Sequence, residues 1–203
     1  NDIESAGGQA ILYKGDMTSP ADVEGLIAKT IEAFGSSIDI LVNVAGGLVA
    51  RKTIEEMDLE FFNYVMQLNI SSTFLVTKAV VPYMSEGASI VNFASQAGRD
   101  GGGPGASAYA TSKGAVMTFT RSMAKELGPK GIRVNSLCCG MISTTFHDTF
   151  SKPEGRKATA GNTPLRREGA PNEVADTVSF LASSDAAFVS GINMDVNGGL
   201  VFS

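Results

Sequence analysis

Hydrophobic residues in this chain follow two patterns, short continuous runs and longer stretches with helical spacing. The short runs predict β-strands at Ala10–Asp16, Ile38–Val44, Ser89–Ala94, Ile132–Cys138 and Asn193–Val196. The longer stretches predict α-helices at about Pro20–Phe34, Leu59–Met84, Tyr109–Leu127 and Pro171–Leu181. Near-continuous apolar strands separated by helices are typical of a parallel sheet with both faces covered. We therefore predict a single α/β domain over residues 1–203, without internal repeats or linkers.

Local signals mark where some of the predicted helices begin and end. Ser19 is placed to cap the first helix, Pro20 occupies its first turn, and Gly35 follows its last residue. Gly128–Pro129 is expected to end the predicted helix Tyr109–Leu127. The polar segment Met141–Gly169 has no firm periodicity, so no helix or strand is assigned to it.

One candidate for chemistry is the pair Tyr109 and Lys113, which share one face of a predicted helix at spacing i, i+4. A free phenol, with a pKa of about 10, is a poor acid–base group near neutrality. A cation about 5 Å away at an effective dielectric of about 20 contributes roughly 3 kcal/mol and lowers that pKa by about two units. Tyr109 is therefore a candidate proton donor to a carbonyl oxygen, with Ser95 as a second hydrogen-bond donor. The spacing alone is a weak signal, because such pairs are usually a solvated helix face.

Composition limits the classes of function that are open. The net charge of −5 and the isoelectric point near 4.9 argue against nucleic acid or an anionic membrane as the main partner. No apolar run approaches the roughly 20 residues of a membrane span. The start Asn1–Glu4 has no signal-peptide character.

The two cysteines, Cys138 and Cys139, are neighbours in the sequence. Their Cα atoms lie about 3.8 Å apart, which is shorter than is usual for a disulfide. We interpret them as buried thiols in a reducing compartment and expect a cytoplasmic protein. A vicinal redox pair is the alternative.

Several short motifs follow one another in a fixed order between Ala10 and Gly199. They are Asp16, Asn43-Val44-Ala45-Gly46, Asn69, Ser95, Tyr109-x-x-x-Lys113, Arg133-Val134-Asn135, Cys139-Gly140 and Asn197-Gly198-Gly199. Each is common alone, but the ordered set resembles the short-chain dehydrogenase/reductase family. Within it, the chain is most similar to 3-oxoacyl-ACP reductases, glucose dehydrogenases and related carbonyl reductases. The resemblance implies a Rossmann-like, doubly wound parallel sheet.

The resemblance also implies an oxidoreductase that interconverts a carbonyl and a secondary alcohol by hydride transfer. Tyr109 would be the general acid in reduction and the base in oxidation, and Ser95 would orient the substrate oxygen. Lys113 would lower the pKa of Tyr109 and bind the ribose hydroxyls next to the nicotinamide. Asn69 would kink its helix and hold a water that connects Lys113 to solvent.

The implied cofactor is NAD or NADP, and no metal is implied. The residues implied to bind it, besides Tyr109 and Lys113, are Asp16, Asn43, Ala45, Gly46, Ile142 and Thr144. The aspartate would accept a hydrogen bond from the adenine amino group, and the next three residues would pass close to the adenosine ribose. The last two would contact the nicotinamide carboxamide. The strand end that selects between NAD and NADP is not in the sequence.

Simpler explanations stay open for some of these residues. Asp16 can be a turn residue, Ser95 can cap the loop that follows it, and Asn69 can face solvent. His147, in the polar segment, is interpreted as a surface residue rather than a catalyst.

The chain departs from the family pattern at several positions. Val44 replaces the second asparagine of Asn-Asn-Ala-Gly. This change is tolerable because that side chain does not transfer protons. Cys139-Gly140 replaces Pro-Gly, which removes a fixed φ and is expected to loosen the nicotinamide wall. The loop before Tyr109 is glycine-rich and slightly longer than expected. Its Gly101–Gly105 cluster is rejected as a phosphate loop, because it lies several residues after its strand and Pro104 removes a donor.

Family members begin with a strand, a glycine-rich phosphate loop and a second strand, which these 203 residues do not contain. In the strand order 3-2-1-4-5-6 the absent strands lie between Ala10–Asp16 and Ile38–Val44, so both would have an unpaired edge. Either the protein has further residues or the fragment rearranges, and we expect the former. The 203 residues alone are expected to bind NAD(P) without useful affinity, because the backbone donors for the pyrophosphate are absent.

Two functions from different classes follow. The Ser95–Tyr109–Lys113 set favours an enzyme with a small-molecule carbonyl or alcohol substrate, whereas the absent phosphate loop favours a catalytically silent scaffold of the same fold. Apolar residues surround most of the helix Leu59–Met84, and the Tyr109 helix is similar. Such faces usually mark an interface, so we expect a homotetramer, with a dimer as the fallback.

Overall fold

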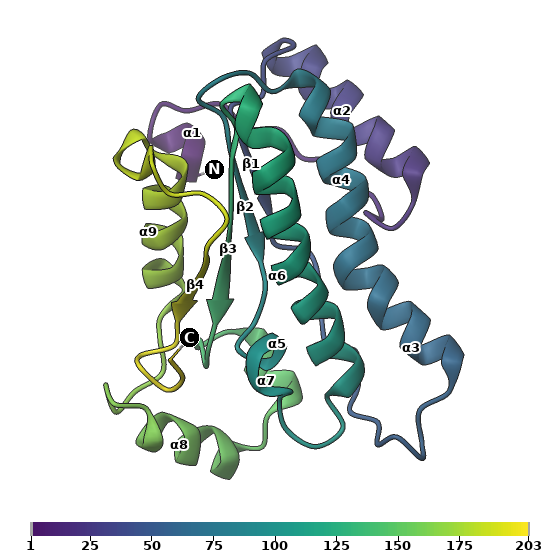
Figure 1. The fold of residues 1–203 in the computed structure, drawn as a ribbon, viewed down its shortest axis with the longest axis vertical. Coiled ribbons are helices and arrows are strands. Elements are labelled where there is room, and N and C mark those ends of the chain that lie inside the picture. The colour runs from purple at the N-terminus through teal and green to yellow at the C-terminus, as the bar shows by residue number, and fades with distance from the viewer. Residues whose placement is uncertain (1, 203) are drawn as a thin grey trace.

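The computed structural model describes residues 2–202, and its centre is a four-stranded parallel sheet (Figure 1). The strands, in spatial order, are β1 (Ile40–Asn43), β2 (Ser89–Phe93), β3 (Arg133–Cys139) and β4 (Asn193–Val196). The α/β class and the parallel, Rossmann-like sheet predicted from the sequence are therefore confirmed.

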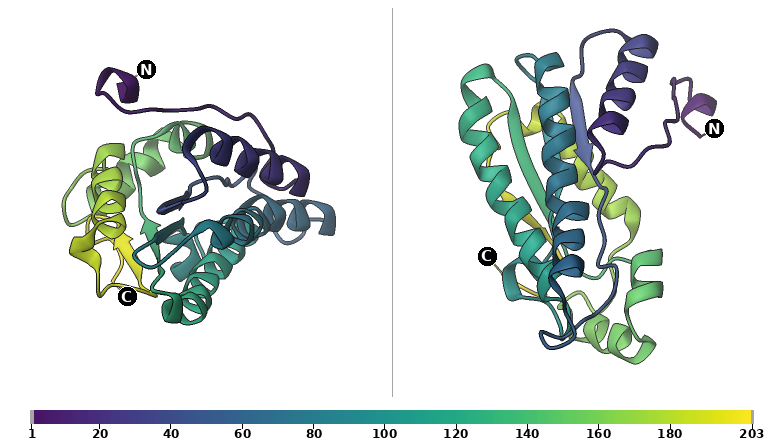
Figure 2. Two further views of the ribbon diagram at one scale, coloured as in Figure 1. Left: turned by 90° about the horizontal axis from the view of Figure 1, so that it is seen from above. Right: turned by 90° about the vertical axis from the view of Figure 1, so that its right-hand side faces the viewer.

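Helices cover both faces of this sheet, as Figures 1 and 2 show. On one face α6 packs on the strands, with α4 beside it and α2 against α4, while α9 covers the other face. In the part of the chain that the structure describes, no helix is long and apolar enough to cross a membrane. The bounds are α2 (Pro20–Phe34), α4 (Ser72–Val80), α6 (Ser107–Leu127) and α9 (Pro171–Ala182).

The core follows from the two-residue period of the central strands. Ile90 and Val134 pack in a cluster with α6, whereas Val91 and Leu137 pack in a cluster with α9. All four side chains have an exposed fraction of 0%, and full burial of each contributes about 1.5–3 kcal/mol. Because both faces are covered, β2 and β3 are buried along nearly their whole length rather than at alternate positions, and the sequence shows short apolar runs there without regular alternation.

The strand predicted at Ala10–Asp16 is wrong. This segment pairs with no strand among residues 2–202, and Leu12 is 98% exposed. Figure 2 shows the N-terminal segment running apart from the sheet. An apolar run becomes a strand only where a neighbour accepts its backbone hydrogen bonds, and β1 is the edge of the described sheet. Ile40, in that edge strand, is 50% exposed.

The long helix predicted at Leu59–Met84 is interrupted. It consists of α3 (Leu59–Met66), a π-helical turn (Gln67–Ser71), α4, and a 3₁₀ turn (Val81–Tyr83). The π-helical turn surrounds Asn69, in agreement with the predicted kink at this residue.

Two helices of the polar segment were not predicted, α7 (Thr145–Phe150) and α8 (Pro153–Asn162). Neither contains a buried residue, so neither has the apolar stripe on which a sequence prediction depends. Two short helices, α1 (Asp2–Ser5) and α5 (Ala97–Asp100), were also missed. By contrast, α2 begins and ends as predicted, with Ser19 as N-cap and Gly35 after its last residue.

Gly98 supplies a test of how closely α5 approaches α6. A Cβ atom at this position would lie 2.8 Å from the Gly114 nitrogen and 2.8 Å from the Lys113 carbonyl carbon. We expect Gly98→Ala to lower the free energy of unfolding by about 1–3 kcal/mol, because backbone atoms of α6 cannot yield as a side chain does. Denaturant unfolding followed by circular dichroism measures this change.

The matched control is Gly114→Ala, whose Cβ would meet nothing closer than 3.4 Å, the Gly98 oxygen. This variant should be neutral or stabilising, because alanine favours a helix interior by about 0.8–1.0 kcal/mol over glycine. A Gly98→Ala protein as stable as wild type would contradict the close approach.

Candidate active site

The predicted catalytic residues meet at the carboxyl ends of β2 and β3. Ser95 follows β2, and Tyr109 and Lys113 lie on one face of α6. All three line a cavity of about 720 Å³. Ligands of open parallel sheets bind at this end of the strands, so the three residues lie where a substrate and a cofactor would meet.

Lys113 is a buried ammonium group, with only 5% of the residue exposed. Its Nζ donates a 2.7 Å hydrogen bond to the Phe93 carbonyl oxygen and lies 5.8 Å from the centre of the Tyr109 ring. Burial lowers the pKa of Lys113 to about 8, because desolvation disfavours the charged form. At pH 7 the group is still mainly protonated.

Burial also controls Tyr109, and it acts in the direction opposite to the one expected from the sequence. Desolvation raises the pKa of this phenol, while a hydrogen bond with the Ser95 side chain opposes the shift. The expected lowering by Lys113 is wrong for this structure, because burial of the phenolate is the largest influence on this pKa and the ammonium is directed at Phe93. The phenol is therefore protonated at neutral pH, the state that a proton donor needs.

Asn69 fixes the loop that follows β1. Its Oδ1 accepts a 3.0 Å hydrogen bond from the Gly47 N–H, and its Nδ2 donates to the carbonyl oxygens of Gly47 and Val65, both at 2.9 Å. The residue is fully buried, which excludes the solvent-facing alternative. These contacts use both protons of the Asn69 amide. The water that the resemblance implies at Asn69 stays a prediction.

Gly46 passes so close to Lys113 that only glycine fits. Its φ is +153°, and a Cβ atom would lie 2.5 Å from Asn69 Oδ1 and 3.1 Å from Lys113 Nζ. Gly46 and Gly47 therefore form a cavity wall without side chains beside a buried cation. A bare backbone, an ammonium and about 720 Å³ of space fit the ribose and nicotinamide of a dinucleotide.

Two predicted cofactor residues, Asn43 and Asp16, do not line this cavity, and their side chains form hydrogen bonds within the protein. Asn43 is buried, and its Nδ2 donates to Asn92 Oδ1 at 2.9 Å and to Thr77 Oγ1 at 3.2 Å. Asp16 is a turn residue whose Oδ1 accepts from the Thr18 N–H and hydroxyl, both at 2.8 Å. These bonds, the backbone one first, hold the pKa of Asp16 below its usual value.

Of the other predicted cofactor residues, Ile142 and Thr144 line the cavity and Ala45 does not. The Thr144 hydroxyl donates a 3.3 Å hydrogen bond to the Ile142 carbonyl oxygen. Sequence reasoning missed Phe146, whose ring centre lies 5.9 Å from that of Tyr109. The usable signal was an aromatic residue shortly after β3, in a segment without periodicity.

A second cavity, of about 210 Å³, shares the reaction centre with the first. Ser95, Tyr109 and His147 line both. The prediction that His147 is a surface residue is wrong, because it is half-buried and its Nδ1 lies 2.9 Å from Ser151 Oγ. Burial lowers the pKa of His147, so the ring is neutral at neutral pH.

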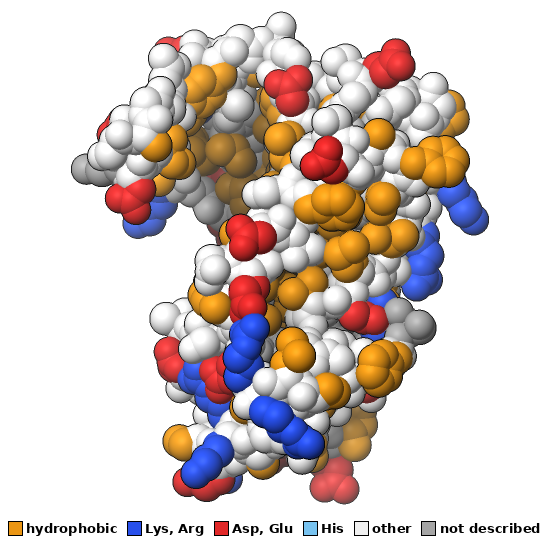
Figure 3. Space-filling view, turned by 90° about the vertical axis from the view of Figure 1, so that its left-hand side faces the viewer, with side chains coloured by type: hydrophobic (Ala, Val, Ile, Leu, Met, Phe, Trp, Pro, Cys, Tyr) orange, Lys and Arg blue, Asp and Glu red, His pale blue; other side chains and the backbone are white. Residues whose placement is uncertain are grey.

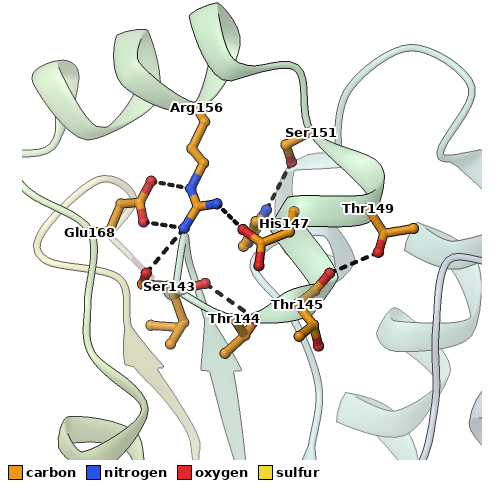
Figure 4. A network of polar contacts seen from close by, with 10 residues as sticks. Ser143, Thr144, Thr145, His147, Thr149, Ser151, Arg156 and Glu168 are labelled. Atoms are coloured by element: carbon orange, nitrogen blue, oxygen red, sulfur yellow. Dashed lines mark hydrogen bonds and ion pairs between the residues drawn. The ribbon is translucent and has the colours of Figure 1, made fainter.

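Arg156, from α8, ties together the segment that covers these cavities (Figure 4). Its guanidinium forms ion pairs with Asp148 of α7 and with Glu168, which precedes α9. Its Nη2 also donates a 3.0 Å hydrogen bond to Ser143 Oγ. Polar contacts therefore hold α7 and α8 in place where apolar burial is lacking.

Cys138 and Cys139 are free thiols. Burial raises the pKa of both, that of Cys139 to about 11. A thiol that is protonated at neutral pH is a poor nucleophile, which argues against a vicinal redox pair. Nowhere in residues 2–202 do three or more His, Cys, Asp or Glu side chains form a group that could hold a metal ion.

Comparisons with known proteins found relatives over almost the whole chain. A family model described as enoyl-(acyl carrier protein) reductase matches residues 1–201. A 2-(R)-hydroxypropyl-CoM dehydrogenase of Xanthobacter autotrophicus is 40% identical over 195 residues, which are 94% of this chain and 77% of that protein.

Solved structures are similar over the whole fold. A short-chain dehydrogenase/reductase described as a glucose/ribitol dehydrogenase, from Brucella melitensis, matches with a TM-score of 0.90 at 33% identity, covering 100% of this chain and 82% of that one. A blue fluorescent protein from a metagenomic library, in complex with NADPH, matches with a TM-score of 0.91 at 29% identity, covering 99% and 80%.

The burial of Lys113 makes stability depend on pH. Its folded pKa is about 8, whereas an unfolded lysine titrates at about 10.4, so the buried proton costs roughly 3 kcal/mol at pH 7. We expect Lys113→Met to raise the free energy of unfolding by about 1–3 kcal/mol at pH 7, the lost bond to Phe93 offsetting part of the gain. Urea unfolding at pH 7 and pH 10 measures the effect.

The gain should shrink as the pH rises from about 8 to 10, because there the unfolded wild type binds more protons than the folded one and wild-type stability increases. Lys125→Met, at an exposed position of the same helix, should show no such pH dependence. An equal difference at both pH values would contradict the assigned burial cost.

Proposed function

Because the chain belongs to the short-chain dehydrogenase/reductase family of oxidoreductases, we propose that it interconverts a carbonyl and a secondary alcohol by hydride transfer, with NAD or NADP as cofactor. The observation that carries this proposal is the meeting of Ser95, Tyr109 and Lys113 on the wall of one cavity. The proposed substrate is a small molecule, since the second cavity at the reaction centre measures about 210 Å³.

Tyr109 is the proposed general acid in reduction and the base in oxidation. The bound cofactor supplies or accepts the hydride at the carbon of the reacting group. Ser95 Oγ accepts a 3.2 Å hydrogen bond from the Ala97 N–H, so its hydroxyl proton can turn from Tyr109 to the substrate oxygen when a substrate binds. Two donors then meet the oxygen on which negative charge develops.

Lys113 is the proposed partner of the phenolate that remains after the proton leaves Tyr109. A buried cation near the ring stabilises that anion more strongly than it would in water. The close approach of Gly46 to Nζ also leaves the ammonium beside bare backbone, where ribose hydroxyls can accept from it. Asn69 is proposed to hold a water that carries protons between Lys113 and solvent.

The proposed cofactor site extends from Lys113 along the walls of the larger cavity. Ile142 and Thr144 would contact the nicotinamide carboxamide. Asn43 would hold the loop that bears Gly46 in place from within the core. Ala45 and Asp16 are proposed to contact the adenosine half.

We also propose a cytoplasmic location. Both cysteines are free, and burial keeps their thiols protonated. Neighbouring thiols that stay reduced suit a reducing compartment.

A homotetramer is the proposed assembly, because two separate surfaces keep apolar side chains exposed. On the first, Phe74 of α4 is 45% exposed and meets Phe119 of α6 edge to face, with ring centres 6.4 Å apart. The second includes Phe180 of α9 and Phe188, which are also exposed. Figure 3 shows further hydrophobic side chains on the face that carries α9. Two self-complementary surfaces are what a tetramer with two-fold axes requires.

Tyr109→Phe tests the chemistry. In the full-length protein this variant should lose NAD(P)-linked carbonyl reduction by at least 10²-fold, because a positioned acid contributes about 10²- to 10⁴-fold. Cofactor binding should be retained, since only a hydroxyl is removed. Steady-state kinetics and fluorescence titration with NAD(P)H measure the two effects. Tyr83→Phe, outside both cavities, is the control, and activity of Tyr109→Phe within about tenfold of wild type would reject the assignment.

Phe74→Glu tests the assembly. A charge on the exposed α4–α6 surface should split the tetramer into dimers, because an unpaired carboxylate is costly to bury in an interface. Light scattering at micromolar concentration measures the mass. Lys29→Glu, exposed on α2, should leave it unchanged. A monomeric wild type would contradict the proposal.

A further inference from the structure

The smaller cavity is lined by residues of different chemical character. Ser95 and Tyr109, the proposed reaction centre, line it together with Phe146. Arg51 and His147 also line it, with the hydroxyl-bearing residues Ser151 and Thr159. Its remaining walls include the apolar residues Leu48, Ala97, Ala106, Met141 and Leu200. A substrate whose carbonyl lies beside Ser95 and Tyr109 would therefore share this cavity with one cationic side chain, that of Arg51.

Arg51 is held in a defined position beside this cavity. Its Nη1 donates a 3.0 Å hydrogen bond to the Pro104 carbonyl oxygen, and its Nε donates at 3.4 Å to that of Phe150. Gly105, with φ of +73°, packs so closely that a Cβ atom would lie 3.0 Å from Arg51 Cβ. The guanidinium thus bridges the glycine-rich loop and the end of α7. Two of its five N–H groups make these bonds, and the others remain available to a ligand.

Among the described residues, Arg51 lacks the carboxylate partner that several other arginines have. Arg99, Arg156 and Arg167 each form an ion pair with a carboxylate. Within residues 2–202, no carboxylate forms an ion pair with Arg51. Asp100 also lines the cavity, but its two oxygens accept hydrogen bonds from Gln96 Nε2 and from the Gly102 N–H.

We propose that Arg51 binds a carboxylate of the substrate while Tyr109 and Ser95 hold its reacting oxygen, an inference that rests on the proposed function. The planar donor set of the guanidinium matches a carboxylate in two-point contact. The cavity, at about 210 Å³, is below the range of about 300–1,000 Å³ for drug-sized ligands. The substrate class is therefore a short oxo acid or the corresponding hydroxy acid.

The test compares 3-oxobutanoate, 4-oxopentanoate and 5-oxohexanoate with their methyl esters as substrates of the full-length protein. Each pair has the same carbonyl and differs in the charge at the far end. We expect wild type to prefer at least one acid, and Arg51→Gln to lower kcat/KM for that acid by about 10- to 100-fold, the range of a hydrogen bond to a charged group. The kcat/KM for the ester should change by less than about threefold, which is the effect expected of a substitution at the protein surface.

Two further variants separate recognition from general effects. Arg51→Lys keeps the charge and should retain part of the preference for the acid. Lys52→Gln removes the neighbouring cation, which pairs with Asp58 at 3.9 Å and does not line the cavity, and should leave the preference unchanged. Equal rates of wild type on acid and ester, or an equal loss on both in Arg51→Gln and Arg51→Lys, would overturn the proposal and leave the proposed reaction standing.

Calorimetric titration with the same acids and esters keeps the proposal testable if no ketone is reduced. Binding of an acid that is tighter than that of its ester, and is lost in Arg51→Gln, would support the carboxylate site and contradict the proposed reaction. Binding without preference would overturn the carboxylate site.

Discussion

A buried ammonium group sets the constraint on which the site depends. Lys113 lies almost out of water, and its charge is tolerated because the last carbonyl of β2, that of Phe93, accepts a 2.7 Å hydrogen bond from it. That bond fixes α6 relative to the sheet, and Tyr109, one helical turn earlier, is fixed with it. On the other side, Gly46 can approach the ammonium only because it has no side chain. The Lys113 ammonium therefore constrains both the surroundings of the Tyr109 phenol and the backbone at Gly46, which passes close to it.

Buried amides extend this constraint into the sheet. Asn43 in β1 donates to Asn92 in β2, which donates to Thr120 in α6 at 3.0 Å. A buried polar group without a partner costs about 1–3 kcal/mol, so this chain of bonds permits one strand register and one seating of α6. Asn43 belongs to a motif that the family resemblance places near the cofactor, yet its contacts in the structure are those of the core. Position beside a ligand and structural support for the loop are compatible roles for one residue.

Much of this arrangement was predictable from the sequence, and what was not has physical causes. Continuous apolar runs identified β2 and β3, and the Tyr109–Lys113 spacing identified the reaction centre, because each signal is local. The segment Ala10–Asp16 has an equally good strand pattern, but a strand also needs a neighbour, which no local pattern encodes. The pKa of Tyr109 was predicted in the wrong direction because spacing reports the distance to a charge and not the loss of water. Phe146 escaped detection, and His147 was assigned to the surface, because α7 and α8 bury no apolar stripe.

The parts of the site that were predicted from the sequence and the parts that were missed also differ in stability. Tyr109 and Lys113 are on a helix packed against a core strand, whereas α7 and α8 are held by the ion pairs of Arg156 with Asp148 and Glu168. Exposed ion pairs contribute little and are screened by salt, and segments with few apolar contacts open most easily. Phe146 and His147, which line both cavities, therefore lie on a less stable part of the chain than the proposed proton donor. Changes in α7 and α8 can therefore alter the shape of both cavities without moving Ser95, Tyr109 and Lys113.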